Sequence, residues 1–196
     1  GDAKETATLS DGYMYSTLSV KDVARDLTFK MFINQKWIDN INNEFGGYKG
    51  KKLPNANEVT TIEEYLTILR AFKELDANLN DDANDEIPVT SKSLEYLRNF
   101  ILASYGYVST GAEIENDNSK YSYVPYQEAY RKYLQIARTM WNEGLMDVST
   151  FSNKTDNQMA QNGVKNRLGS FPAAAAYLIV GYDLEENYVT FGPLTS

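Results

Sequence analysis

The 196-residue sequence contains no cysteine and no histidine. Without cysteine there is no disulfide framework and no thiolate site. Without histidine, Ser-His-Asp and Cys-His nucleophilic machinery is excluded, and so are the usual zinc sites. Any catalysis would therefore depend on carboxylates, lysine or tyrosine.

Long apolar runs and positive charge are also scarce. No apolar run approaches the roughly 18 residues of a membrane span. Lysine and arginine number 19 against 27 acidic residues, and the resulting net charge of −8 argues against a nucleic-acid partner, whose phosphates need a basic face. The hydrophobic fraction of 42% is that of an ordinary globular protein, and the length suits one domain.

The first residue is Gly1 and not an initiator methionine, and no signal peptide follows it. We interpret Gly1 as an engineered or processed end, and we expect the chain to be a piece of a longer protein. The lack of cysteine is compatible with export from a bacterial cell.

The most informative stretch is an acidic loop between residues 76 and 88. Oxygen-bearing side chains occur at alternate positions, at Asp76, Asn78, Asn80, Asp82 and Asn84. Two adjacent acids, Asp85 and Glu86, follow them. Ca²⁺ takes about six to eight oxygen ligands, and a loop of this pattern can wrap around one ion. The loop departs from the EF-hand, because Asp81 replaces the sharp-turn glycine and Ile87 replaces the bidentate glutamate. The alternative is a solvated polar turn, since Asn and Asp tolerate turn backbones.

A strongly patterned helix is predicted directly before this loop, from Ile62 to Leu75. Thr61 and Glu64 form a capping box at its start. Apolar residues then repeat at helical spacing, at Ile62, Tyr65, Leu66, Leu69 and Phe72. The acidic loop is thereby placed at the carboxyl end of a helix, where partial negative charge suits a cation.

The rest of the chain alternates between predicted helices and short strands. Strands are predicted at 13–20, 27–33 and 167–171, with extended pieces at 89–90 and 188–191. Helices are predicted to follow Asn34, to follow Ser91 or Ser93, to run from Pro125 to a cap at Gly144, to lie near 157–161, and to run from Pro172 to Val180. The predicted inward face of the Pro125 helix is Tyr130, Tyr133, Leu134, Ala137 and Trp141. Residues 107–124 are interpreted as an irregular excursion or a hairpin. This alternation favours a helix-rich α/β fold, with α+β as the alternative.

Several motifs occur in the order of a known family. They are Asp11-Gly12 with Tyr15, Phe32-Ile-Asn-Gln-Lys-Trp37, Leu53-Pro54, Thr61-Ile-Glu-Glu-Tyr65 with Leu69-Arg-Ala-Phe72, the acidic loop through Pro88, Asn142-Glu-Gly-Leu-Met-Asp147 and Arg167-Leu-Gly169. In this order the chain, from about Asp11 to Phe171, resembles the extracellular solute-binding proteins of ABC importers, the large lipoprotein type that includes alginate-binding proteins. It departs from their pattern in three ways. The acidic loop is one residue longer than their commonest form, Leu79 replaces a glycine in that loop, and the proline that follows the Glu-Gly-Leu motif is missing.

The resemblance implies a periplasmic-binding-protein-like fold of two lobes, of which residues 1–196 would be a single lobe carrying the calcium-type loop at 76–88. It implies a structural Ca²⁺ held by the side chains of Asp76, Asn78 and Asn80, by the carbonyl of Asp82, and by Asp85 and Glu86. The longer loop leaves the choice between Asn84 and Asp85 open. It also implies an extracellular or periplasmic location, with a lipid anchor and an ABC permease partner for the full-length protein.

The leading functional hypothesis is non-catalytic binding of a solute, most simply an oligosaccharide, in a cleft between two lobes. Ligand crevices in open α/β sheets lie beyond the carboxyl ends of strands, which suggests Ser170 and Phe171 as contacts. Tyr13 and Tyr15 are suggested at the cleft edge because tyrosine rings stack on sugars. For all four residues, ordinary packing is the alternative. The rival functions are a calcium-stabilised carbohydrate-active enzyme that uses a carboxylate pair and an adhesion domain held by calcium.

Overall fold

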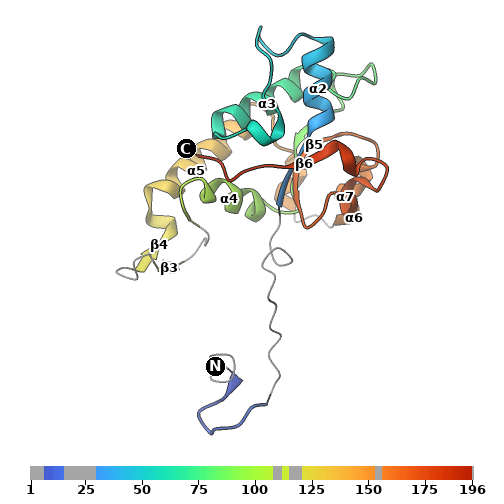
Figure 1. The fold of residues 1–196 in the computed structure, drawn as a ribbon. Coiled ribbons are helices and arrows are strands. Elements are labelled where there is room, and N and C mark those ends of the chain that lie inside the picture. The colour runs from blue at the N-terminus through green and yellow to red at the C-terminus, as the bar shows by residue number, and fades with distance from the viewer. Residues whose placement is uncertain (1–6, 16–29, 108–111, 115–120, 153–155, 196) are drawn as a thin grey trace.

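The computed structural model describes residues 7–15, 30–107, 112–114, 121–152 and 156–195 (Figure 1). Its α-helices are α2 (Gln35–Glu44), α3 (Ile62–Glu74), α4 (Leu94–Ala103), α5 (Glu128–Asn142), α6 (Asp156–Gly163) and α7 (Tyr177–Val180). Its strands are β1 (Lys30–Asn34), β2 (Ile87–Val89), β3 (Ala112–Ile114), β4 (Tyr121–Tyr123), β5 (Leu168–Ala173) and β6 (Tyr188–Thr190). Short 3₁₀ helices are η2 (Ala56–Glu58), η3 (Val124–Tyr126), η4 (Val148–Ser152) and η5 (Glu185–Asn187).

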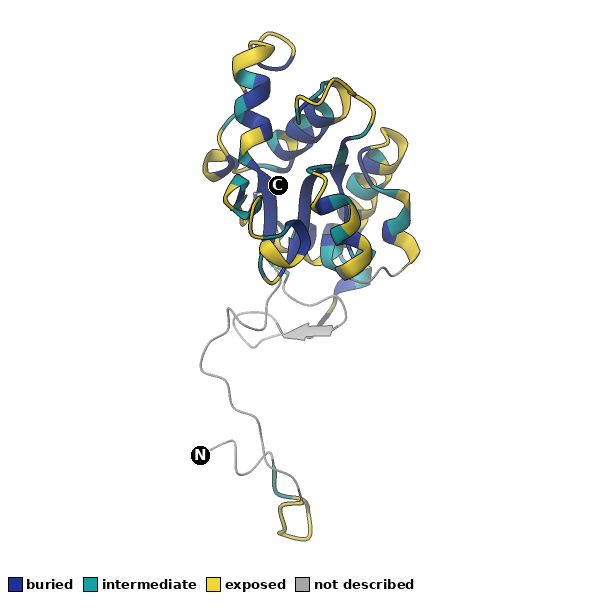
Figure 2. Cartoon of the chain, turned by 90° about the vertical axis from the view of Figure 1, so that its right-hand side faces the viewer, coloured by how far each residue is buried: buried dark blue, intermediate teal, exposed yellow. Residues whose placement is uncertain are grey.

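The central sheet has the strand order β2-β5-β1-β6. Strands β2 and β5 are parallel, whereas β1 runs antiparallel to both of its neighbours. Strands β3 and β4 pair as a separate hairpin, which confirms the hairpin interpretation of the excursion. Figure 2 shows the sheet strands as buried elements among helices. The predicted helix-rich α/β class is confirmed.

Both faces of the sheet are covered. Alternate side chains of β1 point to opposite faces, as the period of a strand requires. Met31 and Ile33 join a buried cluster built with α2, α3, α4 and α5, whereas Phe32 joins a second cluster with Phe171 and residues of α6 and α7. Every residue of β5 is buried. A sheet covered on two sides explains why β5 has no alternation of polar and apolar residues.

The predicted starts of α2 and α3 are confirmed. The Asn34 side chain accepts a hydrogen bond of 3.1 Å from the Trp37 amide and begins α2. At α3, the Thr61 hydroxyl accepts from the Glu64 amide at 3.2 Å, and the Glu64 carboxylate accepts from the Thr61 amide at 3.0 Å. Since a capping box satisfies amides that the first turn leaves free, these local residues fix where each helix begins.

The end of α5 is also as predicted and aligns the next segment with the sheet. Gly144 has φ +65°, and the Leu145 amide donates back to the Met140 carbonyl at 2.9 Å. This is the six-to-one bond of a Schellman cap. The Val89 amide then donates to the Leu145 carbonyl at 3.1 Å, so the segment after the cap lies beside β2.

The prediction that Pro172 starts a helix is wrong, because Pro172 lies inside β5 opposite Met31. Strand β2 pairs with β5 only as far as Ser170, whose carbonyl accepts from the Thr90 amide at 3.0 Å. Backbone groups two residues apart face the same side of a strand, so the backbone of Pro172 faces the same side as that of Ser170. Since β2 does not extend beyond Ser170, no β2 residue is left without a partner by the missing N–H of Pro172. Helix α7 is correspondingly short and begins at Tyr177.

The prediction that Pro125 opens the helix capped at Gly144 is also wrong. Pro125 lies in η3, and the extended backbone of Gln127 separates that turn from α5. The predicted inward face is wrong in part, since Leu134 and Trp141 are 51% and 49% exposed. The buried residues of α5 are Ala129, Tyr133 and Met140.

The predicted N-terminal strands have mixed outcomes. Residues 13–15 are not in a strand, and 16–20 of the same prediction lie outside the described residues, as do 27–29 of the next. Residues 30–33 of that second prediction belong to β1. The predicted extended piece at 89–90 corresponds to β2, the strand at 167–171 to β5, the extended tail to β6, and the helix near 157–161 to α6.

A buried hydroxyl pair gives a test of the packing. Tyr65 donates to the Ser170 hydroxyl at 3.0 Å, and Ser170 donates to the Phe32 carbonyl at 2.7 Å. Ser170→Ala should destabilise the fold by about 1–3 kcal/mol, because the buried Tyr65 hydroxyl loses its partner. Adding Tyr65→Phe should recover part of the loss in urea unfolding. Strictly additive losses would contradict the coupling of these two side chains.

Candidate functional site

The acidic loop joins the end of α3 to the start of β2, as predicted. Its backbone turns sharply at two non-glycine residues, Leu79 with φ +57° and Asp81 with φ +68°. These are the two positions at which the solute-binding pattern or the EF-hand pattern carries glycine. The loop therefore keeps a left-handed turn although the glycines that normally permit it have been replaced.

The oxygens at alternate positions bind the loop's own backbone. The two carboxylate oxygens of Asp76 accept from the amides of Asn80 at 3.1 Å and Asp81 at 2.9 Å. The Asn78 side-chain oxygen also accepts from the Asn80 amide at 3.1 Å, and the Asn80 side-chain oxygen accepts from the Asp82 amide at 2.9 Å. These bonds curl the loop around its polar side chains.

Asp85 closes the loop. Its two carboxylate oxygens accept from the side-chain amides of Asn78 and Asn80, each at 2.9 Å. Arg167, the residue before β5, donates to the same carboxylate through Nε at 2.8 Å. Within the loop, Asn84 donates hydrogen bonds to Asp82 alone. Sequence reasoning missed Arg167, since nothing local marks a partner 82 residues away.

Glu86 lies against the start of the loop. Its Oε1 accepts from the Ala77 amide at 2.9 Å, whereas its Oε2 is buried without a hydrogen-bond partner. Burial raises the pKa of Glu86 above its ordinary value, and the nearby charges of Asp85 and Asp76 raise it further. A cation at this place would offset both effects.

The predicted metal-site residues are thus linked to one another, but they do not form a cluster of carboxylates. Within the described ranges, no three acidic residues approach closely enough to hold a metal by themselves. Amide oxygens supply the remaining donors, and amide and carboxylate oxygens are the ligands that Ca²⁺ prefers. The donor chemistry and the buried, unpartnered Oε2 of Glu86 fit a hard cation.

The four suggested ligand contacts do not come together. Ser170 and Phe171 are completely buried in β5, where their contacts are with the core, in agreement with the packing alternative. Tyr13 and Tyr15 are exposed, and Tyr15 donates to Asp11 at 2.9 Å. No described contact joins either tyrosine to β5.

Sequence reasoning missed an exposed aromatic pair that follows β5. The rings of Tyr177 and Tyr182 are parallel within 7° and have centroids 4.9 Å apart, and Tyr182 is 73% exposed. A second exposed pair, Trp141 and Phe151, meets edge to face at 5.2 Å. Exposed aromatic faces are suited to stacking on the apolar faces of sugars.

Comparison with solved structures assigns the fold. The chain is similar to the S. pneumoniae ABC-transporter substrate-binding protein FusA in complex with kestose, with 21% identity and a TM-score of 0.74 over 99% of this chain and 38% of that one. It is also similar to a solute-binding protein of Bifidobacterium longum infantis described as binding HMO, with 22% identity and a TM-score of 0.76 over 99% and 39%.

A third similar structure is an EF-hand mutant of FusA in complex with fructo-nystose, with 20% identity and a TM-score of 0.75 over 99% of this chain and 38% of that one. No protein-family model matches the chain, and no curated protein matches it in sequence. The chain has the fold of part of an ABC-importer solute-binding protein. It spans about two fifths of the length of the proteins it resembles.

The strained loop backbone leads to a prediction. A left-handed conformation costs a non-glycine residue about 1–2 kcal/mol. Leu79→Gly should therefore raise the free energy of unfolding by up to about 1 kcal/mol, because glycine's extra freedom in the unfolded chain offsets part of the gain. Ala83→Gly is the matched control: Ala83 is exposed in the same loop without a positive φ, and its replacement should lower stability by about 0.4–1 kcal/mol. Equal effects of the two substitutions would contradict the loop geometry.

Proposed function

We propose that this chain is one lobe of an extracellular receptor that binds an oligosaccharide and delivers it to the permease of an ABC importer. The observation that carries this proposal is a TM-score of 0.74–0.76 over 99% of the chain to two such receptors, one of them in complex with the oligosaccharide kestose. The full-length protein would be held at the membrane by a lipid anchor. Among the described residues, no helix is long and apolar enough to cross a membrane.

The surface that we propose for the sugar lies beyond the carboxyl ends of β2 and β5. Crevices of open α/β sheets bind ligands there. Tyr177 and Tyr182 follow β5 and present a ring face to solvent. Beyond β2, Thr90 donates to the Asp147 carboxylate at 2.9 Å, and Ser149 donates to its other oxygen at 2.8 Å. Aromatic faces beside polar groups are the usual composition of a sugar site.

We further propose a structural role for Ca²⁺ in the acidic loop. Asp76, Asn78, Asn80 and Glu86 would supply side-chain oxygens, Asp82 its carbonyl, and Asp85 would either bind the ion or orient the asparagines. The ion would supply positive charge beside Glu86, whose pKa is raised by burial and by the charges of Asp85 and Asp76. It would thereby fix the end of α3 to the start of β2.

The rival enzyme function has less support. A glycoside hydrolase needs one acid with a raised pKa and an ionised partner flanking one bond. Glu86 has a raised pKa, but it is buried against the loop backbone. Glu143 is bound to Arg70, whose guanidinium lowers the pKa of Glu143. Glu86 is therefore enclosed by the loop, and Glu143 is held ionised by Arg70.

Sugar binding should require the whole protein. In titration calorimetry with an oligosaccharide panel that includes kestose, the full-length protein should bind and this chain alone should bind weakly or not at all, because half a cleft buries too little ligand surface. Tyr182→Ala in the full-length protein should weaken binding about 3- to 10-fold. The control is Tyr126→Ala, an 87% exposed tyrosine of η3, which directly follows β4; the β3–β4 hairpin and α7 lie on opposite sides of the molecule in Figure 1. Equal affinities of chain and full-length protein, or release of reducing ends, would contradict the proposal.

Calcium should stabilise the chain by mass action. Melting should occur at a higher temperature in millimolar Ca²⁺ than in chelator, and Glu86→Gln should remove most of that difference. Glu44→Gln, an exposed acid at the end of α2, should leave the difference intact. Identical melts of the unaltered chain in Ca²⁺ and chelator would show that the hydrogen bonds of the loop suffice without an ion.

A further inference from the structure

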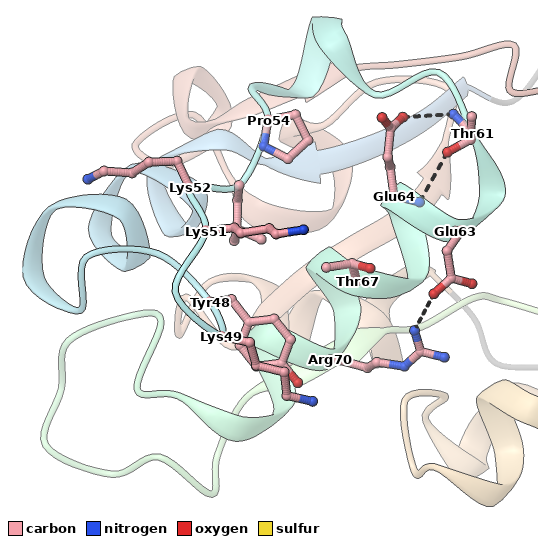
Figure 3. Close-up of a pocket in the computed structure, with 11 residues that line it drawn as sticks. Tyr48, Lys49, Lys51, Lys52, Pro54, Thr61, Glu63, Glu64, Thr67 and Arg70 are labelled. Atoms are coloured by element: carbon pink, nitrogen blue, oxygen red, sulfur yellow. Dashed lines mark hydrogen bonds and ion pairs between the residues drawn. The ribbon is translucent and has the colours of Figure 1, made fainter.

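A cavity of about 560 Å³ opens between the segment 48–54 and α3 (Figure 3), and its lining includes no residue of the acidic loop or of the proposed sugar surface. Its volume lies within the range of small-molecule sites. One wall is the turn that carries Lys49, Lys51 and Lys52, and the other is the face of α3 that carries Thr67 and Arg70. Neither the fold comparison nor the proposed function assigns a role to this cavity.

The turn is held in one conformation. Tyr48 and Lys51 exchange two backbone hydrogen bonds of 2.8 and 3.1 Å, and the residues between them, Lys49 and Gly50, have φ of +51° and +78°. This is the geometry of a two-residue hairpin turn with both central residues left-handed. A lysine with positive φ is uncommon. The two backbone hydrogen bonds hold Lys49 in this conformation and thereby fix where the neighbouring lysines leave the backbone.

Two further contacts pin the same wall. The Asn42 side chain accepts from the Leu53 amide at 2.8 Å and donates to the Leu53 carbonyl at 2.9 Å. A Cβ added at Gly47 would lie 2.1 Å from the carbonyl oxygen of Lys51, so the chain packs against itself there. The wall is therefore formed before any ligand arrives, which lowers the entropic cost of binding.

Most charges around the cavity are already paired. Arg70 binds Glu63 at 2.8 Å and Glu143 at 2.6 Å. Glu64 is engaged in the capping box of α3. Lys49 lies 3.9 Å from Glu74 and over the Tyr48 ring.

Lys52 donates to the Asn42 carbonyl. Lys51 is different: no hydrogen bond or ion pair joins its ammonium to any residue that the structure describes, and Figure 3 shows it extended into the cavity toward Thr67. Among the described residues that line the cavity, the Lys51 ammonium thus has no recorded partner, and the Thr67 hydroxyl lies beside it. The buried side chains of Tyr48 and Leu53, with Pro54, supply an apolar wall.

We propose that this cavity binds a carboxylate group attached to an apolar body. The Lys51 ammonium would pair with the carboxylate, the Thr67 hydroxyl would donate to it, and Tyr48, Leu53 and Pro54 would contact the body. A single negative charge suits one ammonium. A phosphate dianion is disfavoured because Glu63 and Glu64 border the same space and because the Glu64 amide of the first turn already donates to Thr61.

The test is an NMR titration of the ¹⁵N-labelled 196-residue chain with benzoate, benzamide and inorganic phosphate. Benzoate should give saturable shifts at residues 48–53 and at Thr67, whereas benzamide and phosphate should bind at least fivefold more weakly. Absence of saturable benzoate shifts, equal binding of benzamide, or tighter binding of phosphate would each overturn the proposal.

Variants at matched lysines separate a specific contact from general charge. Lys51→Gln should weaken benzoate binding at least fivefold, whereas Lys49→Gln, which removes a lysine already paired with Glu74, should change it less than twofold. Thr67→Val should weaken binding with an unchanged melting temperature. Equal effects of the two lysine substitutions would refute a specific role for Lys51.

The carboxylate could belong to a free small molecule or to the C-terminus of a protein. Two hexapeptides that end in Leu-Phe distinguish these sources: one has a free C-terminal carboxylate, and the other has a C-terminal amide. Tighter binding of the free peptide than of benzoate, lost with Lys51→Gln, indicates a protein terminus, and tighter binding of benzoate indicates a small molecule. Equal binding of the acid and the amide peptide at this cavity would contradict carboxylate recognition.

Discussion

The pairing of β5 between β2 and β1 is the constraint on which the rest of the structure depends. The strand is buried along its whole length, and each feature of interest is fixed relative to it. Arg167, just before the strand, binds the acidic loop through Asp85. Ser170 ties α3 and β1 together through Tyr65 and the Phe32 carbonyl. The residues after the strand lead to the exposed rings of Tyr177 and Tyr182.

Close packing along β5 leaves little freedom at its start. A Cβ added at Gly169 would lie 2.5 Å from the Phe72 ring and 2.7 Å from the Pro88 carbonyl oxygen. Helix α3, β2 and β5 are therefore in direct contact at the point where the acidic loop leaves α3 and enters β2. The loop bridges two elements that are already packed together, so its hydrogen bonds and a bound cation would act on the same junction.

Features determined by neighbouring residues were predictable from the sequence. The capping box of Thr61 and Glu64 and the glycine cap at Gly144 involve groups within one helical turn, and both are present in the structure. Features determined by distant partners were not. Pro172 is tolerated in a strand only because β2 ends opposite Ser170. The inward face of α5 depends on what it packs against, which exposes Trp141 and buries Met140. Likewise, neither the contact of Arg167 with Asp85 nor the stacking of Tyr177 on Tyr182 has a local sequence signal.

The central claim is that sugar binds beyond the carboxyl ends of β2 and β5. Hydrogen exchange of the full-length protein, with and without its tightest-binding oligosaccharide, tests it most directly. The account predicts slower exchange at residues 90–91 and 174–182 in the presence of the sugar, with the amides of the acidic loop unchanged. Protection confined to the acidic loop, or the absence of any protection in this lobe while sugar is bound, would contradict it.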